Sequence, residues 1–227
     1  IRTHKWNVKR YRMQSKVILA TTAILIILPT IYFFFFEFQD MPLKKRIWES
    51  LFQSITPRTA GFNTADLTQI SESGLAIMIL LMLIGGSPGS TAGGMKTTTF
   101  AVMVSTAISV FRRREHTNFF GRRIEDDTIR NASTILMMYL TFFFAGGLLI
   151  SSIEGIPLVT CLFETASAIG TVGLTLGITP QLGTVSQMIL ICLMYLGRVG
   201  GLTLIFAALS VDKKVLIKYP KEKMTVG

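Results

Sequence analysis

Two stretches of the chain, Thr59-Ala60-Gly61-Phe62 and Thr171-Val172-Gly173-Leu174, decide the fold, because they are two copies of one pattern in a largely apolar sequence. Thr59 and Thr171 are separated by 171 − 59 = 112 residues, and the same offset joins Gly85 to Gly197. The chain therefore contains an internal repeat. The repeated unit is a helix, a short helix, a Thr-x-Gly-apolar loop and a second helix, and parallel copies of such a unit are related by an axis along the membrane normal.

The composition indicates a membrane protein. Only 16% of the 227 residues are charged, against about a quarter in soluble domains, and the mean hydropathy is +0.52 despite a net charge of +10. Two histidines in polar segments and two distant cysteines, Cys161 and Cys192, offer no metal cluster, disulfide scaffold or histidine-based catalytic triad. The sequence therefore argues against an enzyme.

Four apolar blocks predict membrane spans. The first has 20 uncharged residues, enough at 1.5 Å per residue to cross a bilayer core of about 30 Å, and Pro29 should kink it. No cleavage-like site follows that block, so it is not a signal peptide. The predicted spans are Val17 to Phe36; Gly74 to Ile84, continuing as Met95 to Phe111; Ala132 to Ile153; and Thr184 to Val211.

Two shorter apolar stretches, Ile47 to Ile55 and Pro157 to Ile169, are too short to span and are predicted to enter the membrane and return. They contain the matching pairs Leu51-Phe52 and Leu162-Phe163. The fold class expected is an all-α integral membrane protein with two tandem units. Its expected parts are a basic linker (1–16), a first pore unit (17–111) with a glycine-rich loop (85–94), a second linker (112–131), a second pore unit (132–211) and a tail (212–227).

Basic residues predict the orientation. Residues 1–16, 112–130 and 212–227 hold 17 of the 23 lysines and arginines, and such segments stay on the cytoplasmic side. Both Thr-x-Gly loops then lie on the outer side, together with the contrary trio Lys44, Lys45 and Arg46. Topology and lipid headgroup contact explain the basic clusters, and nucleic-acid binding is not needed.

The Thr-x-Gly loops predict an ion site. Non-helical backbone at membrane depth is tolerated where it lines a water-filled cavity or is buried in protein, and carbonyl oxygens can replace the hydration shell of potassium. Glycine permits the backbone dihedrals that such a filter requires. The expected lining is Thr59, Ala60 and Gly61 with Thr171, Val172 and Gly173.

The glycine-rich segment from Gly85 to Thr97 has three readings. It resembles a phosphate-binding loop only superficially, because Met95 interrupts the required Gly-Lys-Thr order. A simple helix kink is a stronger alternative. However, one straight helix from Gly74 to Phe111 would run about 57 Å, so we favour an unwound loop in mid-membrane.

Four charged residues lie in or near the predicted membrane region, where a charge is by default functional or paired. Arg198 is expected to face the pore and raise a barrier to cations, with a purely structural pairing as the alternative. Glu164 is expected to brace the filter through backbone amides or an arginine. Lys96 either pins the glycine-rich loop or gates directly, and Arg58 ends the first short helix.

The motifs together resemble the Trk/Ktr/HKT superfamily of potassium transporters, and most closely the Ktr-type membrane subunit, over essentially the whole chain. The resemblance rests on these segments: 54–64, 85–97, 170–175 and 197–200. In that family four pore units surround one pore, and this chain resembles the third and fourth. The resemblance implies an intramembrane gate formed by Gly85, Gly86, Gly89, Gly93, Gly94 and Lys96.

The resemblance also implies a multi-pass plasma-membrane protein that transports K⁺, a homodimer, and a cytoplasmic ring of regulatory nucleotide-binding subunits. Whether Na⁺ couples to transport or only stimulates it stays open. Two filter strands cannot encircle an ion, so we expect the first two pore units to be missing from this chain. The alternatives are a short-chain channel completed by oligomerisation and a non-conducting assembly subunit.

Overall fold

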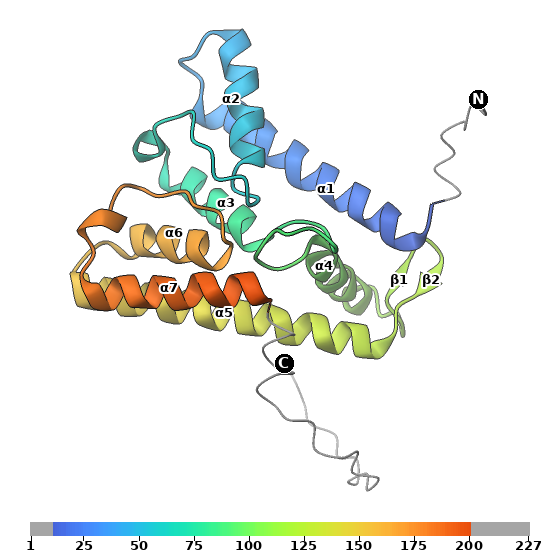
Figure 1. The fold of residues 1–227 in the computed structure, drawn as a ribbon. Coiled ribbons are helices and arrows are strands. Elements are labelled where there is room, and N and C mark those ends of the chain that lie inside the picture. The colour runs from blue at the N-terminus through green and yellow to red at the C-terminus, as the bar shows by residue number, and fades with distance from the viewer. Residues whose placement is uncertain (1–10, 201–227) are drawn as a thin grey trace, which may run out of the picture.

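The computed structural model describes residues 11–200, and it is predominantly helical (Figure 1). The predicted end of the last span and the basic tail lie outside the described residues, as do residues 1–10 of the first linker. In chain order the elements are α1 (Met13–Tyr32), the π-helical η2 (Phe33–Glu37), α2 (Leu43–Ile55), η3 (Leu67–Gln69), α3 (Glu72–Leu83), α4 (Thr97–Phe111), β1 (Asn118–Phe119), β2 (Arg122–Arg123), α5 (Asp126–Glu154), α6 (Leu158–Ile169), η4 (Thr179–Gln181) and α7 (Thr184–Val199).

Two stretches of the chain follow the same order of elements. Each has a long helix, a short helix, a loop with a 3₁₀ turn and a further helix: α1 to α3 in the first stretch and α5 to α7 in the second. The 3₁₀ turns begin at Leu67 and Thr179, and the helices after them begin at Glu72 and Thr184. Both pairs are separated by the 112 residues that separate Thr59 from Thr171.

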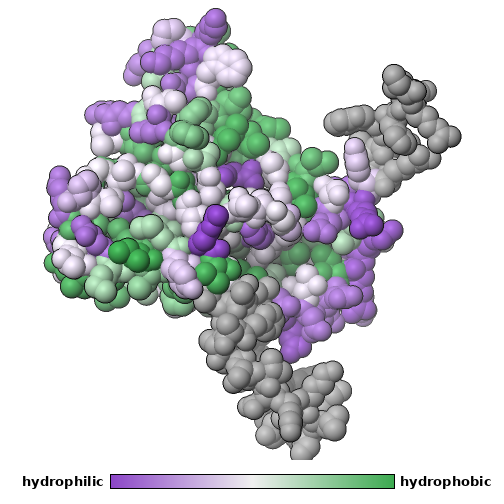
Figure 2. All heavy atoms as spheres, viewed as in Figure 1, coloured by the Kyte–Doolittle hydropathy of each residue, from purple (hydrophilic) through white to green (hydrophobic). Residues whose placement is uncertain are grey.

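Within residues 11–200, two helices are long and apolar enough to cross a membrane: Met13–Glu37 with 25 residues and Asp126–Glu154 with 29. The first contains Pro29 and passes into the π-helical segment at Phe33. Four shorter apolar helices accompany them: α3, α4, α6 and α7. On the face shown in Figure 2, hydrophilic residues gather over the hairpin end and over the opposite edge, and apolar side chains occupy much of the surface between them.

The core surrounds α6, which packs against α3, α5 and α7. Phe163, Cys161 and Ile169 of α6 are at most 1% exposed and lie in one cluster with Met78 and Met82 of α3. By contrast, α2 packs mainly on α1 and η2, and its buried face is polar. The hydroxyl of Thr30 on α1 donates to that of Ser54 on α2 at 2.8 Å.

The segment between α4 and α5 differs from the predicted linker (112–131). It contains an antiparallel hairpin, β1–β2, whose turn places Phe120 and Gly121 at positive φ. The helix α5 begins at Asp126, six residues before the predicted start at Ala132. Buried Ile124 packs with Val102 and Ala132, so an apolar contact draws this basic segment onto the helices.

Candidate ion pathway

The two Thr-x-Gly loops share an unusual backbone. Thr59 and Gly61 have φ values of 67° and 75°, and Thr171 and Gly173 have 50° and 93°, whereas the middle residue of each loop does not have positive φ. Threonine is β-branched and rarely adopts positive φ, so two such threonines at matching positions mark strained backbone. Alternating the sign of φ turns successive peptide planes toward one side, which is the arrangement that a line of carbonyl ligands requires.

The fold brings these loops into contact. The hydroxyl of Thr59 donates to the carbonyl of Gly170 at 3.4 Å. A β-carbon at Gly61 would overlap the carbonyl oxygen of Val172, whereas one at Gly173 would meet open space. All six predicted lining residues therefore come from two loops that lie side by side.

Glu164 of α6 is 4% exposed and holds the loop that follows Gly173. Its Oε1 accepts hydrogen bonds from the Thr175 hydroxyl at 2.6 Å and the Leu176 amide at 3.0 Å, and its Oε2 accepts one from the Thr179 hydroxyl at 2.7 Å. One backbone amide and two hydroxyls are thus its partners. A further contact, from the Gly173 amide to the Ser167 hydroxyl at 3.1 Å, ties the same loop to α6.

The first loop is held differently. Alignment on the Leu-Phe pairs matches Gln53 to Glu164, but both polar atoms of the buried Gln53 amide lack a hydrogen-bond partner among the described residues. Support comes instead from the Thr56 hydroxyl, which donates to the Phe62 carbonyl, and from Glu49, which accepts from the Thr64 hydroxyl at 2.7 Å.

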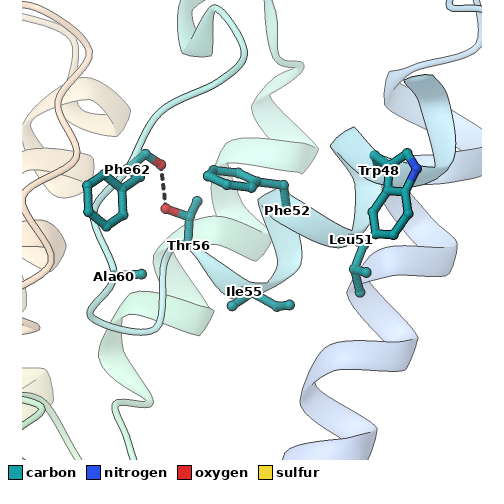
Figure 3. Close-up of a pocket in the computed structure, with 7 residues that line it drawn as sticks. All are labelled: Trp48, Leu51, Phe52, Ile55, Thr56, Ala60 and Phe62. Carbon is teal, nitrogen blue, oxygen red and sulfur yellow. Dashed lines mark hydrogen bonds between the residues drawn. The ribbon is translucent and has the colours of Figure 1, made fainter. Parts of the chain in front are cut away.

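An apolar hollow of about 240 Å³ adjoins the first loop (Figure 3). It is lined by Trp48, Leu51, Phe52, Ile55, Thr56, Ala60 and Phe62. Trp48 and Phe62 are 64% and 73% exposed. A different hollow, of about 590 Å³, extends along the second loop and is lined by Glu164, Thr171 and Gly173 at one part and by Arg198 at another.

The predicted glycine-rich loop (85–94) interrupts the helices α3 and α4. Its base is closed by backbone hydrogen bonds, from the Gly85 amide to the Met95 carbonyl at 2.8 Å and from the Met95 amide to the Leu83 carbonyl at 3.0 Å. The Thr97 amide adds a bond to the Gly86 carbonyl at 3.1 Å. The groups freed by breaking the helix are therefore paired with one another, as a low-dielectric environment requires.

Among the residues that the structure describes, three cationic side chains donate to carbonyls of this loop. Lys96 Nζ bonds Ala92 at 2.6 Å and Ser90 at 3.3 Å, and a guanidinium nitrogen of Arg198 bonds Thr91 at 2.6 Å. Arg58, which follows α2, reaches the Gly85 carbonyl at 3.4 Å. Of the residues predicted for the gate, Gly89 and Gly94 have φ values of 86° and 69° that other residues rarely adopt.

Arg198 lies in the last turn of α7, because the helix ends at Val199 and Gly200 has a φ of 86°. The prediction placed it near the middle of a span that continues to Val211, and the residues after 200 lie outside the described part. Its guanidinium contacts the glycine-rich loop from a helix of the second unit.

Each of the two stretches contains a glutamate that the sequence analysis did not select. It links the end of the long helical segment to the start of the helix that follows the Thr-x-Gly loop. Glu37, at the end of η2, accepts from the Ser71 amide at 3.0 Å and from the Ser71 hydroxyl. Glu154, at the end of α5, accepts from the Gly183 amide at 2.9 Å and the Ser186 hydroxyl at 2.5 Å. Each caps the helix that follows the Thr-x-Gly loop. In the sequence, these two residues could have been selected because a glutamate directly follows each of the apolar blocks 17–36 and 132–153.

Comparison with known proteins identifies the family. The family model described as TrkH, cation transport protein, matches residues 10–217. The chain belongs to the TrkH family of cation transport proteins. This confirms the predicted resemblance to the Trk/Ktr superfamily and the expectation that the chain is not an enzyme.

Individual relatives agree with this assignment. The potassium/sodium uptake protein NtpJ of Enterococcus hirae is 37% identical over 97% of this chain and 51% of its own length. The Ktr system potassium uptake protein B of Bacillus subtilis is 34% identical over 96% of the chain and 50% of its own length. The TrkH-family chain thus spans about half the length of these relatives.

A solved structure shows the same fold. The crystal structure of the potassium transporter TrkH from Vibrio parahaemolyticus superimposes with a TM-score of 0.73 at 17% identity, over 87% of this chain and 44% of that one. The TrkH-family chain therefore has this predominantly helical fold, and about half of that structure has its counterpart here. Membership of a cation transport family makes the chain a membrane protein.

Proposed function

We propose that this chain forms half of a potassium uptake pathway in the cell membrane. The observation that carries the proposal is the repeated backbone of the two Thr-x-Gly loops, each with positive φ at its first and third residues. Carbonyls of Thr59 to Gly61 and of Thr171 to Gly173 contribute two of four filter strands. The names of the relatives, which refer to potassium or to potassium and sodium uptake, agree with K⁺ as the transported ion.

The two stretches α1–α3 and α5–α7 act as the third and fourth pore units. The shared 112-residue spacing of the 3₁₀ turns and following helices supports this, as do the paired caps made by Glu37 and Glu154. The other two strands come from preceding units, since the matched relatives are about twice as long. The apolar hollow beside Ala60 (Figure 3), with its exposed Trp48 and Phe62, is a surface that such a neighbouring unit would cover.

The glycine-rich loop (85–94) acts as the gate of this pathway, with Lys96 and Arg198 holding it through carbonyl contacts. Arg198 also places a fixed positive charge along the hollow that begins at the second Thr-x-Gly loop, which raises the barrier to cations. Glu164 braces that loop. The basic segments 11–16 and 112–130 face the cytoplasm, and the chain crosses the membrane several times.

The assembly follows the family resemblance. The complete protein forms a homodimer whose cytoplasmic face binds a ring of nucleotide-binding regulatory subunits. The existence of Ktr systems with named components B and D among the relatives agrees with a multi-component system.

The test is rubidium uptake by cells that lack their own potassium uptake and express the complete gene product. We expect uptake that potassium inhibits better than sodium does. Removing Gly89 to Gly93 should raise the flux, because the shortened loop cannot close the pathway. Absence of rubidium uptake by a correctly inserted protein would contradict the proposal, and a deletion variant that folds but does not transport would assign the loop a structural role.

A further inference from the structure

The second Thr-x-Gly loop touches the glycine-rich loop directly. The amide of Gly93 donates a hydrogen bond to the hydroxyl oxygen of Thr171 at 3.1 Å, between residues that are 78 positions apart in the chain. Gly93 is buried, and a β-carbon there would overlap the Thr171 side chain. The contact thus combines a hydrogen bond with close packing.

The matching threonine of the first loop has another partner. The Thr59 hydroxyl donates to the carbonyl of Gly170, in the second loop. Its neighbour Arg58 reaches the glycine-rich loop at the carbonyl of Gly85, which lies against Gly93 across the base of the loop. The two equivalent hydroxyls therefore make different contacts. The Thr59 hydroxyl joins the two Thr-x-Gly loops to each other, whereas the Thr171 hydroxyl joins the second Thr-x-Gly loop to the glycine-rich loop.

The contact at Thr171 differs from the contacts made by the charged residues. Lys96 and Arg198 donate to carbonyls in the middle of the loop, at Ser90, Thr91 and Ala92, and Ser90 and Thr91 are exposed. Thr171 accepts from an amide at a buried position where the loop rejoins the helix. A buried amide that loses its acceptor carries a full desolvation cost, so this bond favours the observed position of the loop more strongly than an exposed one does.

We propose that Thr171 is a positioning residue that latches the glycine-rich loop to the filter. This inference rests on the proposed function, which places the Thr171 carbonyl in the filter and makes the loop a gate. The same residue then serves both elements: its carbonyl faces the ion path and its hydroxyl holds the gate. Displacement of the loop requires breaking this bond and separating the packed Gly93 and Thr171.

Loop position can be measured without ion flux. Ser87 is half-buried on the loop, Cys192 is exposed and Cys161 is buried. In the complete protein, reconstituted in lipid nanodiscs, Ser87→Cys is combined with Cys192→Ser and with serine at any exposed cysteine outside this chain. Displacement of the loop uncovers the half-buried thiol at position 87, so its rate of maleimide labelling reports that displacement. The variants to compare in this background are Thr171→Val, Thr171→Ser and Thr59→Val.

We expect Thr171→Val to accelerate labelling about fivefold, the factor that corresponds to losing one hydrogen bond of about 1 kcal/mol. Thr171→Ser keeps the hydroxyl and should stay within twofold of the parent, as should Thr59→Val, although the latter alters the filter. Equal labelling of Thr171→Val and the parent would overturn the latch, and so would an equal acceleration by Thr59→Val.

A second variant tests the same contact in case Thr171→Val does not fold. Gly93→Ala leaves the hydroxyl in place but separates the two groups sterically, so it should also accelerate labelling, and an unchanged rate would contradict the latch. Failure of the proposed function is recognised separately: a parent protein without rubidium uptake contradicts potassium transport, whereas the labelling rates decide the latch alone.

Discussion

The two Thr-x-Gly loops have the same backbone pattern but different supports. The second loop is held from within its own unit, by the buried Glu164 carboxylate and by Ser167. The first loop has the Thr56 and Glu49 hydrogen bonds of its own unit and in addition contacts the second loop, through Thr59 and through the close approach of Gly61 to Val172. The comparison teaches that buried bonds to its short helix hold the second loop more extensively than the first, and it predicts unequal effects for equivalent substitutions.

The largest difference is expected for the glycines. Gly61→Ala adds a β-carbon that overlaps the Val172 carbonyl at a φ of 75°, so both loops must shift. Positive φ and overpacking together cost about 3 kcal/mol. Gly173→Ala meets open space and has only the strain of a φ of 93°, about 1–2 kcal/mol.

Thermal unfolding and rubidium uptake in competition with sodium should therefore rank the parent first, Gly173→Ala second and Gly61→Ala last. The bulkier Gly173→Ser should likewise weaken the preference for potassium, since it too forces a side chain into glycine dihedrals. Unchanged selectivity in a well-expressed Gly173→Ser protein would remove that residue from the filter.

The next effect is expected for the carboxylates. Glu164→Ala removes three hydrogen bonds from a buried site and leaves the Leu176 amide without its acceptor, which should cost about 3 kcal/mol and most of the uptake. Glu49→Ala, the control at a half-buried residue, removes one solvent-exposed hydrogen bond from Thr64 and should cost below about 1 kcal/mol. Denaturation of both purified variants measures the difference, and equal losses would show that the first loop is braced as strongly as the second.

A smaller effect of opposite sign is expected at Gln53. Because its buried amide lacks a hydrogen-bond partner among the described residues, Gln53→Leu should stabilise the protein by about 1 kcal/mol. The readout is the melting temperature in detergent. A lower melting temperature would reveal that the amide binds a group supplied by another part of the assembly, and would make the first loop less different from the second.

The smallest effect concerns Asp66, whose counterpart after the second loop is Ile178. Hydrogen bonds from the hydroxyl and the amide of Thr68 lower the pKa of Asp66 from its ordinary value of 3.8. The Asp66 carboxylate caps the 3₁₀ turn η3. Because its pKa is lowered, its stabilisation of the turn is fully present above pH 3.8 and is lost as the pH falls through the lower pKa of the folded protein.

Amide exchange at Thr68, corrected for its intrinsic pH dependence, should therefore lose protection in that acid range. In Asp66→Ala the protection should already be low at neutral pH and should not change with acid. A parent protein with acid-independent protection would contradict the cap.

Local sequence patterns account for the parts of this structure that depend on neighbouring residues. The short helices, the break between Ile84 and Met95, and the closeness of Glu164 to the second loop all lie within one unit, where spacing and apolar runs carry information. The contact between Gly93 and Thr171 joins positions 78 residues apart, and the bonds from Ser71 to Glu37 and from Gly183 to Glu154 join positions 34 and 29 residues apart. No pattern of neighbouring residues specifies these pairs. The hairpin was missed because strands of two residues are too short to show an alternating pattern, and buried Ile124 with partly buried Phe119 anchors it to the helices.

Because backbone hydrogen bonds close the base of the glycine-rich loop, the residues of its tip can be replaced without opening that base. Since Gly85, Met95 and Leu83 pair their backbone groups across the base, the helices on either side are sealed independently of what lies between them. Changes in the length or chemistry of the tip, around Gly89, therefore leave the flanking helices intact. A photoswitchable linker inserted there would put the pathway under optical control without rebuilding the membrane-embedded scaffold.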